Sequence, residues 1–308
     1  MLTTVLCFNP SNDRTVEVAD FVLDATNRIL AERIEGASKG VNVAVAASRL
    51  GIETACVGLL PRRGGEMIRE RLARDGVRAS FVRIPGAVRT NLKIRDRSRW
   101  AVTELNEPGV AVRDRSLAKA RAQALRLAAD SDYLVLTGSL PPGCPEDFYA
   151  KLIADAPLAC RCVLDASGEV LARALHARPF LIKPNRQELE RACGRELPAL
   201  RDVRAAALSL IGAGARRVAV SLAEEGALLT DGGRALFAPA VAVPVRSAAG
   251  AGDAMVAGMI AGFREGDELE HALRCGVAAA AASVASGRMA PCPATYERML
   301  RAVKVSVI

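Results

Sequence analysis

The sequence predicts an α/β fold in which helices cover a mostly parallel central sheet and a smaller sheet projects from the main body. Three observations lead to this prediction. From about residue 110 onward, helical and strand-like segments alternate along the chain. The strand-like segments are short apolar runs, as expected of strands buried on both faces. The length of 308 residues fits one large domain, or one domain with a small appendage.

The N-terminal third interrupts the regular alternation. Its predicted elements are a strand at 2–8, a helix at 41–50, a strand at 54–57 and a helix at 65–75. Residues 13–38 and 88–104 instead alternate polar and apolar side chains, as extended ribbons do. We expect these two ribbons to form the small projecting sheet. A small sheet with one apolar face needs a cover, either the site beneath it or a partner subunit.

The rest of the chain supplies the parallel sheet and its covering helices. The predicted elements are helix 113–128, strand 133–136, helix 146–154, strand 162–164, helix 168–175, strand 180–182, helices 186–193 and 200–213, strand 217–221, and helices 251–264, 267–285 and 293–303. No internal repeat or long linker separates them.

Composition excludes several classes of protein. The net charge is +8, but the Arg residues are spread along predicted helix faces and no basic run is interleaved with aromatic residues. We therefore expect a phosphorylated small substrate and no nucleic acid. The longest apolar run, at 277–284, is too short to cross a bilayer. The N-terminus lacks the basic start and cleavage site of a signal peptide, so we expect a cytoplasmic protein with no membrane partner.

The eight Cys and two His residues do not predict a metal or disulfide site. Cys160 and Cys162 stand close together, but no second pair or nearby His completes a zinc site. We expect reduced, mostly buried thiols. His176 and His271 fall in predicted helical segments with no Ser or Cys motif beside them, so we expect structural or surface roles for both.

The segment most informative about chemistry is residues 247–258. Its carboxylate, Asp253, follows a run of small residues that ends at Gly252 and precedes an apolar helical pattern. Such a turn exposes backbone N–H groups at a helix N-terminus, where the helix dipole favours an anion. A carboxylate beside an anion pocket suits phosphoryl transfer, because it can take the proton from the attacking hydroxyl. An ordinary acidic residue in a first helical turn gives the same pattern, so this segment alone does not decide between the two.

Two common nucleotide-binding motifs are excluded. A dinucleotide-binding G-x-G-x-x-G sequence needs a third small residue where this segment has Met255. No G-x-x-x-x-G-K-[ST] sequence occurs anywhere in the chain, which excludes a P-loop.

Polar residues elsewhere favour the catalytic interpretation. Lys39 and Asn42 stand in the first turn of a predicted helix, where a lysine opposes the dipole and is therefore expected to bind an anion or a polyol. Asp13 follows the first strand, and open α/β sheets bind ligands at strand ends. Asn185 and Glu188 follow another strand and are three residues apart. We expect them on one helix face, holding Mg²⁺ through water.

These pieces, in this order, resemble the ribokinase-like (PfkB) family of carbohydrate kinases. The resemblance runs over essentially the whole chain and implies one domain over residues 1–308. The implied fold is a three-layer αβα sandwich with a lid built from about 13–38 and 88–104. Lids of this kind pair to form a homodimer, and their closure expels water from the reaction. The motifs that carry the resemblance are Asn9-Pro10 with Asp13, Lys39-Gly-Val-Asn42, Gly138-Ser-Leu-Pro-Pro-Gly143, Asp165-Ala-Ser-Gly-Glu169, Lys183-Pro-Asn185 with Glu188, and Gly250-Ala-Gly-Asp253.

The resemblance also implies a role for each site residue. Asp253 is the base, and the backbone amides beside it form the anion hole; the catalytic set is Gly250, Ala251, Gly252 and Asp253. The substrate-binding set is Asp13, Lys39, Asn42 and Ser139, with Arg89 and Lys93 reaching the phosphate that the sugar already carries. Arg suits this role because its planar fork grips phosphate oxygens in two places. ATP and Mg²⁺ are assigned to Lys183, Asn185 and Glu188, to Ser221, Glu224 and Gly226 on the nucleotide side, and to Ala278 and Ala281, whose small side chains leave room for adenine.

The branch of the family that acts on phosphorylated ketohexoses fits best. Residues 89–93 and 103–109 resemble enzymes that convert fructose 1-phosphate and ATP to fructose 1,6-bisphosphate. Tagatose 6-phosphate and fructose 6-phosphate are alternative acceptors. A non-catalytic sugar-phosphate sensor is disfavoured because a binder needs neither base nor metal. A nucleoside or other small-alcohol kinase is disfavoured by Arg89 and Lys93.

The sequence departs from the family pattern in three places. Ala37-Ser38 stands where the family usually has two glycines, and side chains there would crowd a sugar that normally approaches bare backbone. Ala248-Ala249 and Ala223 also replace the usual residues, and both replacements bear on nucleotide affinity.

Overall fold

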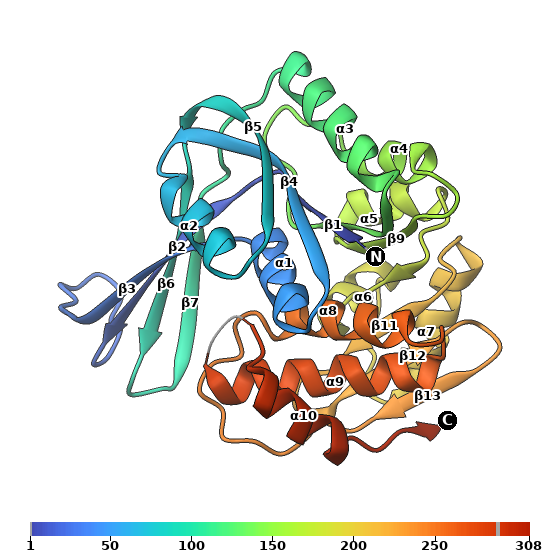
Figure 1. Ribbon diagram of the computed structural model, residues 1–308. Helices are drawn as coiled ribbons and strands as arrows, with labels where there is room; N and C mark the ends of the chain where they lie inside the picture. Colours follow the sequence, from blue (N-terminus) through green and yellow to red (C-terminus); the bar gives the residue numbers. More distant parts are fainter. Residues whose placement is uncertain (1, 288–289) are drawn as a thin grey trace.

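A computed structural model of the chain describes residues 2–287 and 290–308. It confirms the α/β prediction: helices cover both faces of a large sheet, and a smaller sheet projects from one side (Figure 1). In the described residues the main sheet has ten strands in the order β14-β13-β12-β11-β10-β9-β8-β1-β4-β5. These strands are β1 (Leu2–Cys7), β4 (Glu53–Arg63), β5 (Arg78–Ala87), β8 (Ser131–Thr137), β9 (Arg161–Asp165), β10 (Leu181–Ile182), β11 (Val218–Ser221), β12 (Ala227–Thr230), β13 (Ala235–Ala238) and β14 (Ser306–Val307).

The sheet is parallel from β5 to β11 and antiparallel from β11 to β14. The antiparallel edge and β5 were not among the predicted strands. Strands β12 and β13 are four residues each, too short for a clear periodicity. The Asp231-Gly-Gly233 sequence between them is typical of a hairpin turn and could have indicated this pair of strands.

Helices on the two faces enclose two separate cores. The helices are α1 (Lys39–Arg49), α2 (Glu66–Arg74), α3 (Asp114–Ala128), α4 (Phe148–Asp155), α5 (Gly168–Leu175), α6 (Arg186–Cys193), α7 (Leu200–Gly212), α8 (Ala251–Arg264), α9 (Leu269–Ser286) and α10 (Pro293–Ala302), with a 3₁₀ turn, η1 (Ala223–Glu225). Helices α1, α8, α9 and α10 contribute to one core, and α3, α4, α5 and α7 to the other. Strand β1 is buried at every position because Val5 enters the first core and Leu6 the second.

The small sheet has two different faces. Its strands are β2 (Ser11–Val18), β3 (Ile29–Ala37), β6 (Arg89–Asp96) and β7 (Ala101–Asn106), in the order β3-β2-β6-β7. One row of paired residues is Asp13, Asn91 and Asn106, which are polar; the next row on the opposite face includes Ile34, Leu92 and Leu105. Because paired residues share a face, one side of this sheet is polar and the other largely apolar.

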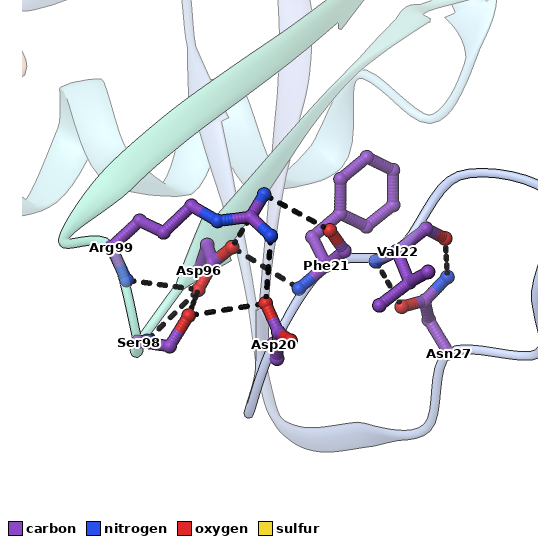
Figure 2. A network of polar contacts seen from close by, with 7 residues as sticks. All are labelled: Asp20, Phe21, Val22, Asn27, Asp96, Ser98 and Arg99. Carbon is purple, nitrogen blue, oxygen red and sulfur yellow. Dashed lines mark hydrogen bonds and ion pairs between the residues drawn. The ribbon is translucent and has the colours of Figure 1, made fainter.

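A polar network fixes the tip of the small sheet (Figure 2). Asp96 accepts hydrogen bonds from the backbone N–H groups of Phe21 (3.1 Å), Ser98 (2.9 Å) and Arg99 (3.2 Å). Burial raises the pKa of Asp96, but these bonds and the Ser98 hydroxyl outweigh it and lower the pKa to about 2. The ionised carboxylate therefore ties the loop after β2 to the turn before β7.

In the described residues, no helix combines the length and the apolar character needed to cross a membrane.

Candidate active site

A cavity of about 940 Å³ lies where the carboxyl ends of β1, β8 and β9 meet the polar face of the small sheet. The chain runs outward from β1 in both directions, through β4 to β5 on one side and through β8 to β11 on the other. Open α/β sheets bind ligands at such a reversal of strand order. Of the predicted site residues, the cavity is lined by Asp13, Lys39, Asn42, Arg89, Lys93, Ser139, Glu188, Gly250 and Asp253.

Asp253 lies in the first turn of α8, with 6% of its surface exposed. Gly250 caps this helix in a left-handed conformation (φ 79°), which glycine adopts without strain. The Asp253 carboxylate accepts a 2.9 Å hydrogen bond from Asn42 Nδ2. Burial, with the nearby charge of Asp165, raises the pKa of Asp253 to about 6, although Lys39, Asn42 and Lys183 oppose the shift. A carboxylate with this pKa is ionised near neutral pH and is a stronger base than an exposed one.

Two ammonium groups converge on a buried carboxylate beside Asp253. Asp165 is 1% exposed, and its oxygens lie 3.4 Å from both Lys39 Nζ and Lys183 Nζ. Burial alone raises the pKa of Asp165, but the two lysines lower it further than burial raises it. Asp165 in turn raises the pKa of Lys39. Asp165 therefore stays ionised and favours the charged form of Lys39.

Lys183 lies under the loop that carries Asp253. A methyl group added at Gly252 would stand 3.4 Å from Lys183 Nζ, so the ammonium group faces the loop directly. Lys183 is 4% exposed. The resemblance assigned Lys183 to the nucleotide phosphates; in the structure its ammonium group lies beside the start of α8, and a helix N-terminus favours an anion.

The small sheet contributes a second charged group. Lys93 Nζ lies 2.8 Å from Asp13 Oδ2 and 3.9 Å from Glu104. Asp13 also accepts hydrogen bonds from Ser11 Oγ (2.9 Å) and Asn91 Nδ2 (3.1 Å). These bonds hold the Asp13 carboxylate in place on the polar face of the sheet.

Arg89 is half-buried and bonded to backbone. Its Nη1 donates to Glu107 O at 2.7 Å and its Nε to Asn9 O at 3.4 Å. A guanidinium group has five N–H donors, so these bonds orient it and leave donors for an anion. Burial lowers the pKa of Arg89, and the negative charge of Asp13 is the largest effect that raises it.

Ser38 and Ser139 line the same cavity as Lys39. Ser38 caps α1 with φ 142°, a region that favours glycine, and its Oγ accepts from Val41 N at 3.3 Å and lies 3.1 Å from Cys7 Sγ. The hydroxyl therefore holds this strained turn at the cavity wall. Ser139 Oγ accepts from Asn9 Nδ2 at 3.2 Å.

Comparison with known proteins identifies the family. The sequence model of the pfkB family carbohydrate kinases matches residues 24–295. The 1-phosphofructokinase of Rhodobacter capsulatus is 39% identical over 303 residues, which are 97% of this chain and 96% of that protein. The chain belongs to the pfkB family of carbohydrate kinases. The 1-phosphofructokinase of Vibrio cholerae is 36% identical to this kinase over 91% of the chain and 88% of its own length.

Solved structures agree with the sequence comparison. Phosphofructokinase-2 from Escherichia coli, in complex with substrates and products, has a TM-score of 0.90 and 30% identity over 98% of this chain and 99% of its own. The same enzyme in complex with fructose-6-phosphate has a TM-score of 0.87 at 30% identity, over 97% of this chain and 98% of its own.

The residues assigned to the nucleotide lie outside the cavity of this kinase. Ser221 ends β11 and forms a bridge with Asn185, and Glu224 is exposed on η1. Gly226 has φ 119°, and a Cβ there would collide with the backbone of Ala238. Ala278 is fully buried in a core, and Ala281 is 8% exposed. Neither alanine lines the cavity wall. In this structure their small side chains pack inside the core around α9.

Asn185 and Glu188 meet at the start of α6, where Asn185 precedes the first helical residue. Asn185 is the N-cap of α6: its side chain accepts from Glu188 N at 2.8 Å, while Glu188 accepts from Asn185 N at 2.9 Å. This reciprocal capping box fixes the Glu188 carboxylate at the cavity wall. The described residues contain no group of three or more His, Cys, Asp or Glu that could hold a metal by itself. Mg²⁺ usually binds through one or two carboxylates together with substrate phosphates and water, and Glu188 fits that pattern.

Several cavity residues received no role from the sequence. Asp165 was part of a motif only, yet it organises both lysines; its place at the carboxyl end of a buried strand was the available signal. Asn9 and Asn91 bind Ser139 and Asp13 respectively. Cys7, at the end of β1, supports the Ser38 turn.

Proposed function

We propose that this kinase transfers the γ-phosphoryl group of ATP to fructose 1-phosphate and forms fructose 1,6-bisphosphate. The observation that carries this proposal is the sharing of one cavity by Asp253, a buried carboxylate at an anion-binding helix terminus, and the cations Arg89 and Lys93. The names of the relatives from Rhodobacter capsulatus and Vibrio cholerae support the same acceptor.

In the proposed reaction Asp253 acts as the general base. It takes the proton of the acceptor hydroxyl while that oxygen forms a bond to the γ-phosphorus and the bond to ADP breaks. The backbone N–H groups of Gly252 and Asp253, with the ammonium group of Lys183, face the negative charge on the transferred group. The N–H of Ala251 instead donates to Ala248 O at 3.2 Å. Lys39 also pairs with Asp165 and adds a second cation.

Arg89 and Lys93 are proposed to bind the phosphate that the sugar already carries. Arg89 is oriented by two backbone carbonyl groups and keeps unused N–H donors. Asp13 and Asn42 bind sugar hydroxyls, and Ser139 lies beside them at the cavity wall.

Glu188 is proposed to hold Mg²⁺ through water, with Asn185 fixing the carboxylate. The ion supplies charge neutralisation to the nucleotide phosphates. Ser221, Glu224, Gly226, Ala278 and Ala281 remain the proposed nucleotide side; contact between the two alanines and adenine requires a rearrangement of the packing around α9.

The small sheet is proposed to act as a lid and to pair with that of a second copy. Its face opposite the cavity carries Ile34 (46% exposed) and Leu105 (56% exposed) in one row. Leu105→Glu should produce monomers in sedimentation velocity, whereas Leu158→Glu, at a fully exposed leucine outside this sheet, should not change the sedimentation coefficient. A cytoplasmic location accords with the proposed substrates.

Fructose 6-phosphate is the second candidate acceptor. The observation in its favour is the structural match to phosphofructokinase-2 from Escherichia coli, which was solved with fructose-6-phosphate. Tagatose 6-phosphate carries its phosphate at the same end and belongs with this candidate.

A coupled ADP-release assay separates these possibilities. It compares fructose 1-phosphate, fructose 6-phosphate, tagatose 6-phosphate and free fructose at equal concentrations. We expect kcat/KM to be at least about tenfold higher for fructose 1-phosphate, since one charge-assisted contact contributes that much. A preference for either 6-phosphate reverses the assignment of the acceptor, and ATP-independent binding without turnover supports a sensor.

A further inference from the structure

The N-termini of α1 and α8 meet through one hydrogen bond between side chains. Asn42 lies in the early part of α1 and Asp253 in the first turn of α8, and these two helices pack against each other. Asn42 Nδ2 lies 2.9 Å from Asp253 Oδ2, and each residue is 6% exposed. The two residues are 211 positions apart in the sequence, so packing alone brings them together.

The chemistry of the pair fixes its orientation. An ionised carboxylate only accepts hydrogen bonds, so the amide of Asn42 must turn its NH₂ group toward Asp253. The Asn42 Oδ1 atom is then left buried without a hydrogen-bond partner among the described residues. A buried amide oxygen without a donor is costly, and a hydroxyl group of a bound sugar satisfies it.

We propose that Asn42 is a positioning residue for the base, because its amide fixes one carboxylate oxygen of Asp253 and thereby presents the other to the acceptor hydroxyl. The proposal rests on the proposed function in one respect, the assignment of Asp253 as the base. It differs from the expectation that Asn42 serves the sugar alone.

The pairing also sets the proton affinity of Asp253. The charged groups that face Asp253 are Asp165 at the end of β9, Lys39 on α1, Lys183 after β10 and, more weakly, Arg71 on α2. Asn42 donates only to the ionised form, so its bond lowers the pKa against the effects of burial and Asp165. Removing that donor should raise the pKa by about one unit.

The test is a direct titration of Asp253 in the full-length protein. Aspartate labelled with ¹³C at Cγ gives one resonance per residue, and the Asp253 resonance is the one missing from Asp253→Asn. In Asn42→Ala the midpoint should move upward by about one pH unit, and the acid limb of kcat should move with it while kcat falls at least about tenfold. Asn91→Ala is the matched control, because it removes an amide bond to Asp13 in the same cavity. It should change KM and leave the Asp253 midpoint in place.

An unchanged Asp253 midpoint in folded Asn42→Ala overturns the proposal. If the alanine variant does not fold, Asn42→Leu keeps the buried volume and must give the same upward shift. Absence of kinase activity in the wild-type protein contradicts the proposed function instead, and the ¹³C titration still decides whether Asn42 controls Asp253.

Discussion

Asp165 and Lys183 form an ion pair with 3.4 Å between the charged atoms and side-chain exposures of 1% and 5%. A buried pair of this kind rarely adds stability, because removing two charges from water costs about as much as their attraction returns. The role of this pair is to position the ammonium group of Lys183 beneath Gly252. Lys39 shares the same carboxylate, with its Nζ 3.4 Å from Asp165 Oδ2.

We predict that Asp165→Asn destabilises the protein by about 3 kcal/mol, because Lys183 would remain buried without a counter-charge. Urea denaturation monitored by circular dichroism measures this. Asp155→Asn, which removes an exposed ion pair with Arg121, should change the free energy of unfolding by less than about 1 kcal/mol. Equal changes in the free energy of unfolding would show that losing the buried Asp165 pair destabilises the protein no more than losing an exposed ion pair.

The same substitution should move the acid limb of kcat to lower pH. Asp165 raises the pKa of Asp253, so its loss lets Asp253 ionise more readily. This direction is opposite to that expected for Asn42→Ala. An acid limb that moves upward in Asp165→Asn would contradict the electrostatic description of the site.

Asp253→Asn should abolish turnover and leave the affinities for sugar phosphate and ATP within a few-fold of wild type. The amide has nearly the same shape as the carboxylate but cannot accept a proton at neutral pH. Isothermal titration calorimetry gives the affinities, and the ADP-release assay gives the turnover. Substantial turnover in this variant would remove Asp253 from the role of base.

The same variant should be more stable than wild type at neutral pH. The pKa of Asp253 is raised in the folded state from 3.8 to about 6, so the unfolded state releases this proton first as pH rises. The free energy of unfolding of the wild type therefore decreases as the pH rises from about 4 to about 6. Asp253→Asn has no carboxyl group at this position and does not show this decrease. We expect a difference of about 3 kcal/mol at pH 7.5 and little difference at pH 4, measured by urea denaturation at both values.

Arg89→Ala should raise KM for fructose 1-phosphate by about 10- to 100-fold and KM for free fructose by less than about threefold. The reason is the loss of a charge-assisted contact that only the phosphorylated sugar can make. Arg95→Ala is the control on the same strand, since Arg95 pairs with Glu17 at 3.4 Å and does not line the cavity. Similar increases for both sugars would place Arg89 away from the phosphate.

Ala223→Gly should raise the free energy of unfolding by about 0.5 kcal/mol. Ala223 has φ 52°, a conformation that costs an alanine about 1–2 kcal/mol, while the added freedom of glycine in the unfolded chain returns part of that gain. Ala213→Gly is the control, because Ala213 has φ −79° and should lose stability. Chemical denaturation of both variants measures the contrast.

Local patterns predicted most of the parallel half of the fold. Helices at 168–175 and 186–193 were predicted with the bounds found for α5 and α6, because apolar spacing and capping residues act over one or two turns. The strands β12, β13 and β14 were missed, since each is too short to show a period of its own. These segments are strands because they pair with neighbouring strands, and a local sequence pattern does not reveal such pairing.

The sequence by itself determined which side chains are candidates for the chemistry: the carboxylate and small residues of 250–253, the cations of the small sheet and the acid at 188. Tertiary structure alone decided their partners: it places Asn42 on Asp253 and Lys183 under Gly252. Backbone preference and burial act on neighbouring residues and so leave a pattern in the sequence. A contact across 211 residues depends on how whole helices and strands pack, and that packing is a property of the entire chain.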